Sequence, residues 1–247
     1  MSVAPLARQR RHTLFFLNEI RDFSPVFLDT DVDMTNVRRH RGGPVRYSIV
    51  SYVLHTAAAV LAKHPDANAA VTGRIRPRIA YHDRVHGKLT LDRTIDGRRV
   101  VLAAVLPDLD LAGLDDIQRQ VEHYRDGDPD RMPEFAGVRA LHRLPATVGS
   151  MAFRRTVRPL RTRAQRVGTF AVTSLGHRPV QSFHSVGGTT VTLGLGQIAD
   201  RPVVRDGAVA IAPLMRLSLA FDHRVIDGAE AADVLTEIKD GLEGYGA

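Results

Sequence analysis

The chain has 247 residues, of which 44% are hydrophobic and 25% charged, a composition typical of a water-soluble globular protein with a substantial core. It contains no cysteine, which excludes disulfide bonds, thiolate nucleophiles and thiolate metal sites. The net charge of +7 suits an anionic partner. With 6% aromatic residues and no nucleic-acid-binding motif, we do not expect that partner to be a nucleic acid.

The sequence has no segment that looks like a membrane span or a secretion signal. The longest apolar run, residues 100–106, is far shorter than the roughly 18 residues that a membrane span needs. The apolar run after the basic start, residues 14–17, is too short for a signal-peptide core. His82 and His86 are four residues apart but lack the carboxylate partners of a metal site. We therefore expect a cytoplasmic protein that binds neither a membrane nor a metal.

The first half of the chain mixes strand and helix patterns. Hydrophobic periodicity predicts strands at residues 26–32 and 99–106, and helices at residues 47–63 and 114–124. Residues 126–166 contain several prolines, among them Pro133, Pro145 and Pro159, and show no clear period, so we expect them to be partly irregular.

The second half reads as short strands followed by a terminal helix. We expect strands at 169–174, 189–198 and 215–221, a hairpin at 202–209 and a helix at 227–242. The hairpin prediction depends on the pair Asp206-Gly207, which favours a tight turn. Because strands and helices do not alternate regularly, the pattern predicts a single α+β domain over residues 1–247. Its mixed sheet would have flanking helices, gathered on one face.

His223 lies between the last predicted strand and the last predicted helix, where loops commonly place catalytic groups. Its imidazole can accept a proton near neutral pH, and Asp227 follows four residues later. The same aspartate, with Glu230, also fits a helix N-cap and capping box. The short string His-x-x-x-Asp-Gly is a weak signal by itself, so the local sequence leaves both interpretations open.

Longer segments, in chain order, carry a family signature. They are Pro5-Leu6-Ala7-Arg8-Gln9-Arg10-Arg11, residues 29–35 and 62–69, Thr169-Phe170-Ala171-Val172-Thr173-Ser174-Leu175-Gly176, residues 192–198, the turn at 206–207, and Pro213 to Ala229. Together they resemble the catalytic domain of the 2-oxoacid dehydrogenase acyltransferases, the E2 components, which share their fold with chloramphenicol acetyltransferase. The resemblance is strong after Gly168 and looser before it. Peptide-synthetase condensation domains have the same fold, but they are longer and typically carry a second histidine where this chain has Asp222.

The resemblance implies a role for each matching residue. His223 would be the general base that removes the thiol proton of coenzyme A, and the Thr173 hydroxyl would stabilise the oxyanion of the tetrahedral intermediate. Asp227 would hold the loop by pairing with an arginine near the N-terminus, for which Arg10 is the first candidate and Arg8 the second. In this family the site forms between neighbouring subunits of a trimer, so His223 and Thr173 need not meet within one protomer.

A cluster of arginines suggests a binding site for phosphate or acidic groups. Arg154, Arg158 and Arg161 would share one helical face, although Pro159 would disturb that helix. They would bind the phosphates of coenzyme A or an acidic carrier domain. A solvated charged face is the alternative.

The resemblance also suggests partners. We expect acyl-coenzyme A as substrate or product. Neither a lipoyl domain nor a subunit-binding domain is recognisable, so a lipoyl group would come from a separate carrier. Because the last residues lack an apolar tail, we expect a homotrimer, not a large cage, with dehydrogenase subunits as further candidate partners.

Two alternatives to this function stay open. One is an acyltransferase of the same fold with a small hydroxyl or amine acceptor, and the other is a non-catalytic trimeric core that organises partner enzymes. Residues 81–105 and 126–166, which should shape the pockets, match the family poorly. The sequence therefore leaves the acyl group and its acceptor undetermined.

Overall fold

The computed structural model describes residues 1, 3–73 and 75–246. Its strands are β1 (Pro25–Asp33), β2 (Ala69–Thr72), β3 (Arg78–Tyr81), β4 (Gly87–Ile95), β5 (Arg98–Leu106), β6 (Phe170–Ser174), β7 (Val191–Leu195), β8 (Ala199–Arg205) and β9 (Ala208–Asp222). Its helices are α1 (Arg11–Glu19), α2 (Thr35–Arg41), α3 (Ile49–Leu61), α4 (Leu114–Asp126), α5 (Ala136–Arg143), α6 (Ala146–Val157), α7 (Leu160–Val167) and α8 (Gly228–Glu243). Short 3-10 turns form η1 (Arg8–Arg10) and η2 (Pro133–Phe135).

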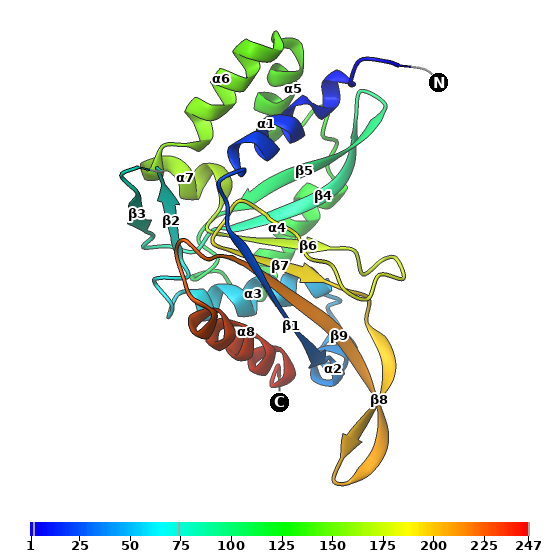
Figure 1. Ribbon diagram of the computed structural model, residues 1–247. Helices are drawn as coiled ribbons and strands as arrows, with labels where there is room; N and C mark the ends of the chain where they lie inside the picture. The colour runs from blue at the N-terminus through cyan, green and yellow to red at the C-terminus, as the bar shows by residue number, and fades with distance from the viewer. Residues whose placement is uncertain (2, 74, 247) are drawn as a thin grey trace.

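The main sheet has seven strands in the order β1-β9-β7-β6-β4-β5, with β8 paired to β9 (Figure 1). Neighbours β4, β6 and β7 are parallel, whereas β9 is antiparallel to both β1 and β7. The β8–β9 hairpin turns at Asp206 and Gly207, whose φ angles of 51° and 77° are the positive values that a type I′ turn requires. The mixed sheet and this hairpin confirm the sequence-based expectation.

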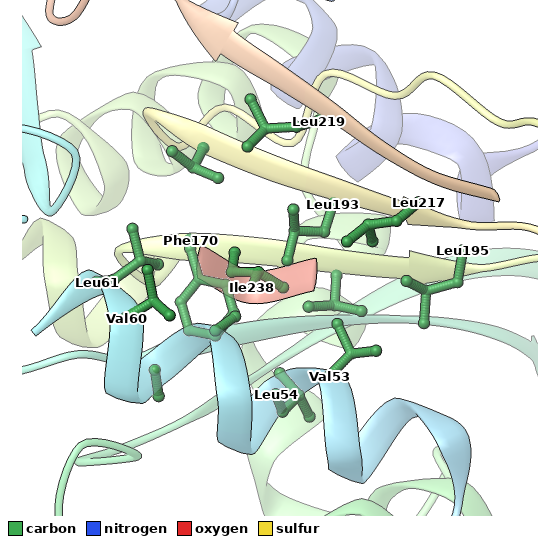
Figure 2. Packing of buried hydrophobic residues seen from close by; sticks show 14 of the residues in the cluster. Val53, Leu54, Val60, Leu61, Phe170, Leu193, Leu195, Leu217, Leu219 and Ile238 are labelled. Atoms are coloured by element: carbon green, nitrogen blue, oxygen red, sulfur yellow. The ribbon is translucent and has the colours of Figure 1, made fainter. Parts of the chain in front are cut away.

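The main core lies between the sheet and the pair α3 and α8 (Figure 2). Alternate residues of the central strands point to this side, including Phe170, Leu193, Leu217 and Leu219, all fully buried. Leu54 of α3 packs against them. The predicted strands and helices correspond to β1, α3, β5, α4, β6, β7, β9 and α8. Their ends shift by a few residues, and β9 is longer because it continues from the hairpin.

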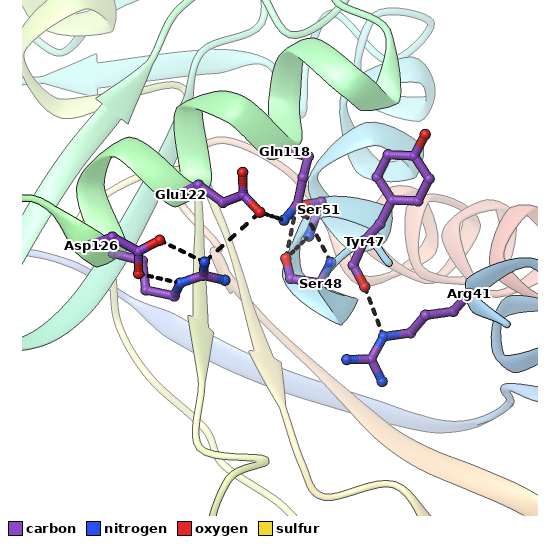
Figure 3. A network of polar contacts seen from close by, with 8 residues as sticks. Arg41, Tyr47, Ser48, Ser51, Gln118, Glu122 and Asp126 are labelled. Atoms are coloured by element: carbon purple, nitrogen blue, oxygen red, sulfur yellow. Dashed lines mark hydrogen bonds and ion pairs between the residues drawn. The ribbon is translucent and has the colours of Figure 1, made fainter. Parts of the chain in front are cut away.

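A polar network fixes the start of α3 against α4 (Figure 3). The Ser48 hydroxyl caps α3 by accepting a hydrogen bond from the Ser51 amide at 3.1 Å. The side-chain oxygen of Gln118 accepts bonds from the Ser48 amide at 2.9 Å and from the Ser51 hydroxyl at 2.7 Å. The network thus satisfies polar groups at the edge of the core that burial would otherwise leave without partners.

The other side of the sheet carries helices too, so the expectation of helices on one face is wrong. There α1, α5, α6 and α7 lie beside β4 and β5 (Figure 1), and the rings of Phe15 and Phe153 join α1 to α6 at 6.2 Å. None of the helices formed by the described residues combines the length and apolar composition needed to cross a membrane.

The stretch 126–166, which we expected to be partly irregular, is mostly helical. Three of its four prolines lie at helix starts: Pro133 begins η2, and Pro145 and Pro159 immediately precede α6 and α7. Proline is tolerated there because the first residues of a helix have no intrahelical acceptor for their N–H groups. In this segment, proline separates short helices from one another.

Candidate active site

His223 begins the turn between β9 and α8. Its backbone N–H donates to the Ser24 carbonyl at 2.9 Å, which extends the pairing of β9 with the chain just before β1. Its ring packs against Phe221 with centroids 5.4 Å apart, and 45% of the side chain is exposed. The imidazole therefore packs against Phe221 on one side and is accessible to solvent on the other, so a substrate can reach it.

The carboxylate of Asp227 lies beside this imidazole. Its Oδ1 is 3.2 Å from Nδ1 of His223. Asp227 precedes α8 but makes no side-chain capping bond, and Glu230 instead contacts Nδ1 of His64 at 2.7 Å. The capping box is therefore not formed. An Nδ1–H directed at Asp227 leaves Nε2 of His223 free to accept a proton.

A second ion pair flanks His223 in sequence. The Asp222 side chain is nearly completely buried, and the Nε of Arg224 donates to its two oxygens at 2.9 and 3.1 Å. Asp222 also accepts a bond from the Arg224 amide at 3.2 Å. The hydrogen bond to Asp222 raises the pKa of the Arg224 guanidinium. This pair fixes the turn, a role that the sequence reading missed although both residues lie within the family signature.

Thr173 lies on β6, with 9% of its surface exposed. Because its neighbour Val172 belongs to the core, Thr173 faces the opposite side of the sheet. It is level with Gly194 on β7, where a Cβ would come within 1.8 Å of the Phe183 carbonyl oxygen. Only glycine fits at position 194, because the chain at residue 183 passes directly over it.

The two predicted catalytic groups are far apart in one protomer. Thr173 is level with Gly194 and, through it, with Ser218 of β9, which precedes His223 by five residues. At about 3.3 Å per residue and about 4.8 Å between strands, the two positions are roughly 19 Å apart. One protomer therefore holds both groups without bringing them together.

The arginine predicted to hold Asp227 is not found beside it. Arg10 and Arg8 are exposed in η1, and among the described residues no ion pair joins either of them to Asp227. The ion-pair partner of Asp227 is His223. Within the described residues of the protomer, the predicted pairing of Asp227 with Arg10 is therefore not formed.

The three arginines proposed for coenzyme A do not share one helical face. Arg154 and Arg158 contact the carboxylate of Glu19 at 3.2 and 2.5 Å, which ties α6 to α1. Arg161 lies on the separate helix α7, because α6 ends before Pro159. Their role in binding coenzyme A stays a prediction.

A cavity of about 840 Å³ lies between α1, α6, α7, strands β4 and β5, and the segment 185–190. Its wall is mainly apolar. Thr90, which is paired with Thr173 across neighbouring strands, lines one part of it. Asp222 and Arg224 line another part. The cavity thus reaches from the strand beside Thr173 to the turn that carries His223.

Comparison with known proteins agrees with this geometry. Residues 143–246 match the model of the family described as 2-oxoacid dehydrogenases acyltransferase (catalytic domain). Over this segment the chain is similar to that family. The chain is 55% identical over 47 residues to the dihydrolipoyllysine-residue acetyltransferase component of the Bacillus subtilis pyruvate dehydrogenase complex. This aligned segment covers 19% of this chain and 11% of that protein.

A longer match joins the chain to the dihydrolipoyllysine-residue succinyltransferase component of the Escherichia coli 2-oxoglutarate dehydrogenase complex. Identity is 26% over 210 residues, covering 81% of this chain and 41% of that protein. The chain therefore spans less than half the length of these curated relatives. The His223 turn and Thr173 both lie inside the part that matches the family model.

Solved structures of the same fold cover nearly the whole chain. A probable dihydrolipoamide acetyltransferase from Listeria monocytogenes has a TM-score of 0.73 at 19% identity, covering 100% of this chain and 97% of its own. A chloramphenicol acetyltransferase has a TM-score of 0.54 at 15% identity, with 98% of both chains covered. The expected chloramphenicol acetyltransferase-like α+β fold is confirmed.

Proposed function

We propose that the chain is a catalytic domain that moves an acyl group between coenzyme A and a lipoyl-type thiol supplied by a separate carrier. The contact between Nδ1 of His223 and Asp227 at 3.2 Å, within the residues that match the family model, is the observation that carries this proposal. The curated relatives are dihydrolipoyllysine-residue acetyl- and succinyltransferases, which supports both the reaction type and the carrier.

The chemistry needs one base and one oxyanion donor. A thiol is mostly protonated at neutral pH and is then a poor nucleophile. Nε2 of His223 removes the thiol proton of coenzyme A as sulfur attacks the acyl thioester, and the carbonyl oxygen becomes an oxyanion. The Thr173 hydroxyl donates to that oxyanion. The intermediate then collapses, the carrier sulfur leaves, and the imidazolium returns the proton to it.

The site is proposed to form between two subunits of a homotrimer. The distance between His223 and Thr173 within one protomer supports this arrangement, because one group alone would provide only half of the chemistry. The β8–β9 hairpin projects from the sheet (Figure 1) and exposes Val204, Val209 and Ile211, which suits burial against another subunit. One structural neighbour is the cubic core of the pyruvate dehydrogenase multienzyme complex.

Another structural neighbour supports the choice of residues. In the dihydrolipoamide acetyltransferase of Azotobacter vinelandii, a serine, a histidine and an asparagine were investigated for roles in the catalytic mechanism. Thr173, His223 and Asp227 are the hydroxyl, imidazole and polar side chain proposed for those roles here.

The test is acyl transfer from acetyl- and succinyl-coenzyme A to dihydrolipoamide, with released coenzyme A and acylated product separated by chromatography. His223→Ala should slow turnover by about 10²–10⁴-fold, because it removes the base. His123→Ala is the matched control, since His123 is an exposed histidine on α4 that pairs with Glu134. Equal rates for wild type and His223→Ala, or no turnover with any acceptor, would contradict the proposal. Turnover only with hydroxyl or amine acceptors would support the alternative acceptor class.

A further inference from the structure

Lys88 is a buried cation in the wall of the cavity. It lies on β4 between Gly87 and Leu89, and only 9% of it is exposed. Because Leu89 faces the core, Lys88 faces the cavity on the other side of the sheet. Its Nζ donates to the Gly187 carbonyl at 2.9 Å and lies 4.3 Å from the ring centroid of Phe16. Neither neighbour carries a negative charge.

Arg163 of α7 is a second cation on the same cavity wall. It is partly buried, and its guanidinium donates to two carbonyl oxygens, of Val157 at 3.1 Å and of Gly188 at 3.0 Å. Burial, and after it the charge of Arg163, lower the pKa of Lys88 to about 8. The two cations are therefore close enough to repel one another.

The two carboxylates that act on Arg163, those of Glu19 and Asp222, are paired with other arginines. Glu19 pairs with Arg154 and Arg158, and Asp222 pairs with Arg224. Glu19 and Asp222 act on Arg163 only at longer range. Within the described residues, neither Lys88 nor Arg163 has a carboxylate at ion-pair distance. Two cations held out of water without a counter-charge are unfavourable, and a bound anion removes that cost.

The apolar part of the cavity wall indicates that the anionic group belongs to a larger, apolar molecule. Much of the cavity wall away from its charged groups is aromatic or aliphatic, and includes Phe16, Ile20, Val105 and Phe153. A volume of about 840 Å³ lies in the range of pockets that enclose small organic ligands. A bare inorganic ion would leave most of this apolar space unfilled.

We propose that Lys88 and Arg163 form an anion site at one end of this cavity, and that the cavity binds an apolar carboxylic acid by its carboxylate. The inference stands on the cavity and its two unpaired cations, and it holds whether or not acyl transfer occurs. Where the proposed transfer also holds, a carboxylate on the acyl group or on the acceptor becomes the feature that this enzyme recognises.

The test is direct binding, measured by calorimetry. The probes are hexanoate, octanoate and decanoate, the alcohols of the same chain lengths, and acetate. We expect the longer acids to bind, the matching alcohols to bind at least about tenfold more weakly because they lack the charge-assisted bonds, and acetate to bind weakly because it lacks the apolar body.

Variants locate the site. Lys88→Met and Arg163→Met should each reduce the affinity for octanoate by about tenfold or more and leave the affinity for octanol unchanged. Lys63→Met and Arg155→Met are the controls, because both residues are exposed and neither lines the cavity. Thermal melting confirms that each variant is folded.

Three outcomes would overturn the inference: no acid binds the wild type, acid and alcohol bind equally, or the control variants lose as much affinity as Lys88→Met. Absence of acyl transfer alongside charge-dependent acid binding would contradict the proposed function and leave the anion site standing.

Discussion

The two faces of the central sheet are built from the same strands but differ in character. The face toward α3 and α8 carries Phe170, Leu193 and Leu219, and it is dry and closely packed. The opposite face carries Thr173 and Lys88, and part of it lines the cavity. Successive side chains of a strand point to opposite faces of the sheet. Core residues and cavity residues therefore alternate along each strand.

The difference between the two faces indicates which substitutions should change function and which should change stability. Substitution on the packed face alters the free energy of unfolding first, and substitution on the cavity face should alter turnover or binding with little loss of stability. Substitutions of Phe170, Thr173, Lys88 and Gln118 test this division between the two faces, with the largest effect expected for Phe170 and the smallest for Gln118.

The largest effect is expected from Phe170→Ala on the packed face. Phe170 is fully buried among α3 and the neighbouring strands, so its truncation leaves a cavity in the core. We expect a loss of about 3–5 kcal/mol in the free energy of unfolding, measured by urea titration. Val101→Ala is the matched control on the cavity face, where 52% of Val101 is exposed, and it should cost less than about 1 kcal/mol. Similar losses for both variants would remove the distinction between the faces.

The second effect concerns Thr173 on the cavity face. Thr173→Ala should lower kcat by about 10²–10³-fold, because one donor to the oxyanion is lost. The free energy of unfolding should change far less than in Phe170→Ala. Thr173→Ser keeps the hydroxyl and should recover most of the activity. If both variants had the kcat of the wild type, the hydroxyl would have no role in the reaction.

The third effect is a dependence of stability on pH that Lys88 introduces. The pKa of Lys88 in the folded chain is about 8, below its usual value of about 10.5. Between these values the unfolded chain binds more protons than the folded chain, so this group makes stability rise with pH. Below about pH 8, Lys88 is charged in the folded chain, and the full free-energy cost of burying its ammonium group remains. Lys88→Met should therefore be more stable than the wild type at pH 7, by up to about 3 kcal/mol.

The Lys88→Met advantage should shrink as the pH rises from about 8 to about 10.5 and vanish above that range. Urea unfolding of both proteins at a series of pH values measures it, with Lys63→Met as the exposed control. A difference that stays constant with pH would show that the buried ammonium does not carry the cost.

The smallest effect is expected at the polar network between α3 and α4 (Figure 3). Gln118→Ala removes the acceptor of the Ser48 amide and the Ser51 hydroxyl and should lower the free energy of unfolding by about 1–3 kcal/mol. Turnover per folded molecule should not change, because the network lies on the packed side of the sheet. Equal loss of stability and of turnover in the folded protein would connect this network to the site.

Elements on the packed face could be predicted from the sequence because their hydrophobic period is strong. This holds for α3 and for β6, and the Asp206-Gly207 pair gave the β8–β9 hairpin its turn. The strand β4 was missed because Arg93 interrupts the alternation of Leu89, Leu91 and Ile95 on its apolar side. Prolines also favour irregular chain in a sequence-based prediction, whereas Pro145 and Pro159 immediately precede α6 and α7.

The site shows the same limit. His223 and Asp227 could be recognised because they are four residues apart in one turn, and a local pattern records a local contact. The contacts of Glu19 with Arg154 and Arg158, and the cavity itself, join segments more than a hundred residues apart, which no short pattern records. Asp227 and Arg10 are also far apart in sequence, so their pairing could be expected only from the family resemblance. This pairing is not present within the protomer.

The division of the active site between subunits can be tested by mixing two inactive proteins. His223→Ala and Thr173→Ala are co-expressed with different tags, and oligomers that contain both are purified. In a cyclic trimer of mixed composition, one of the three interfaces combines an intact His223 with an intact Thr173. We therefore predict about one third of the wild-type turnover, far above that of either parent. Mixed oligomers no more active than their parents would contradict the account.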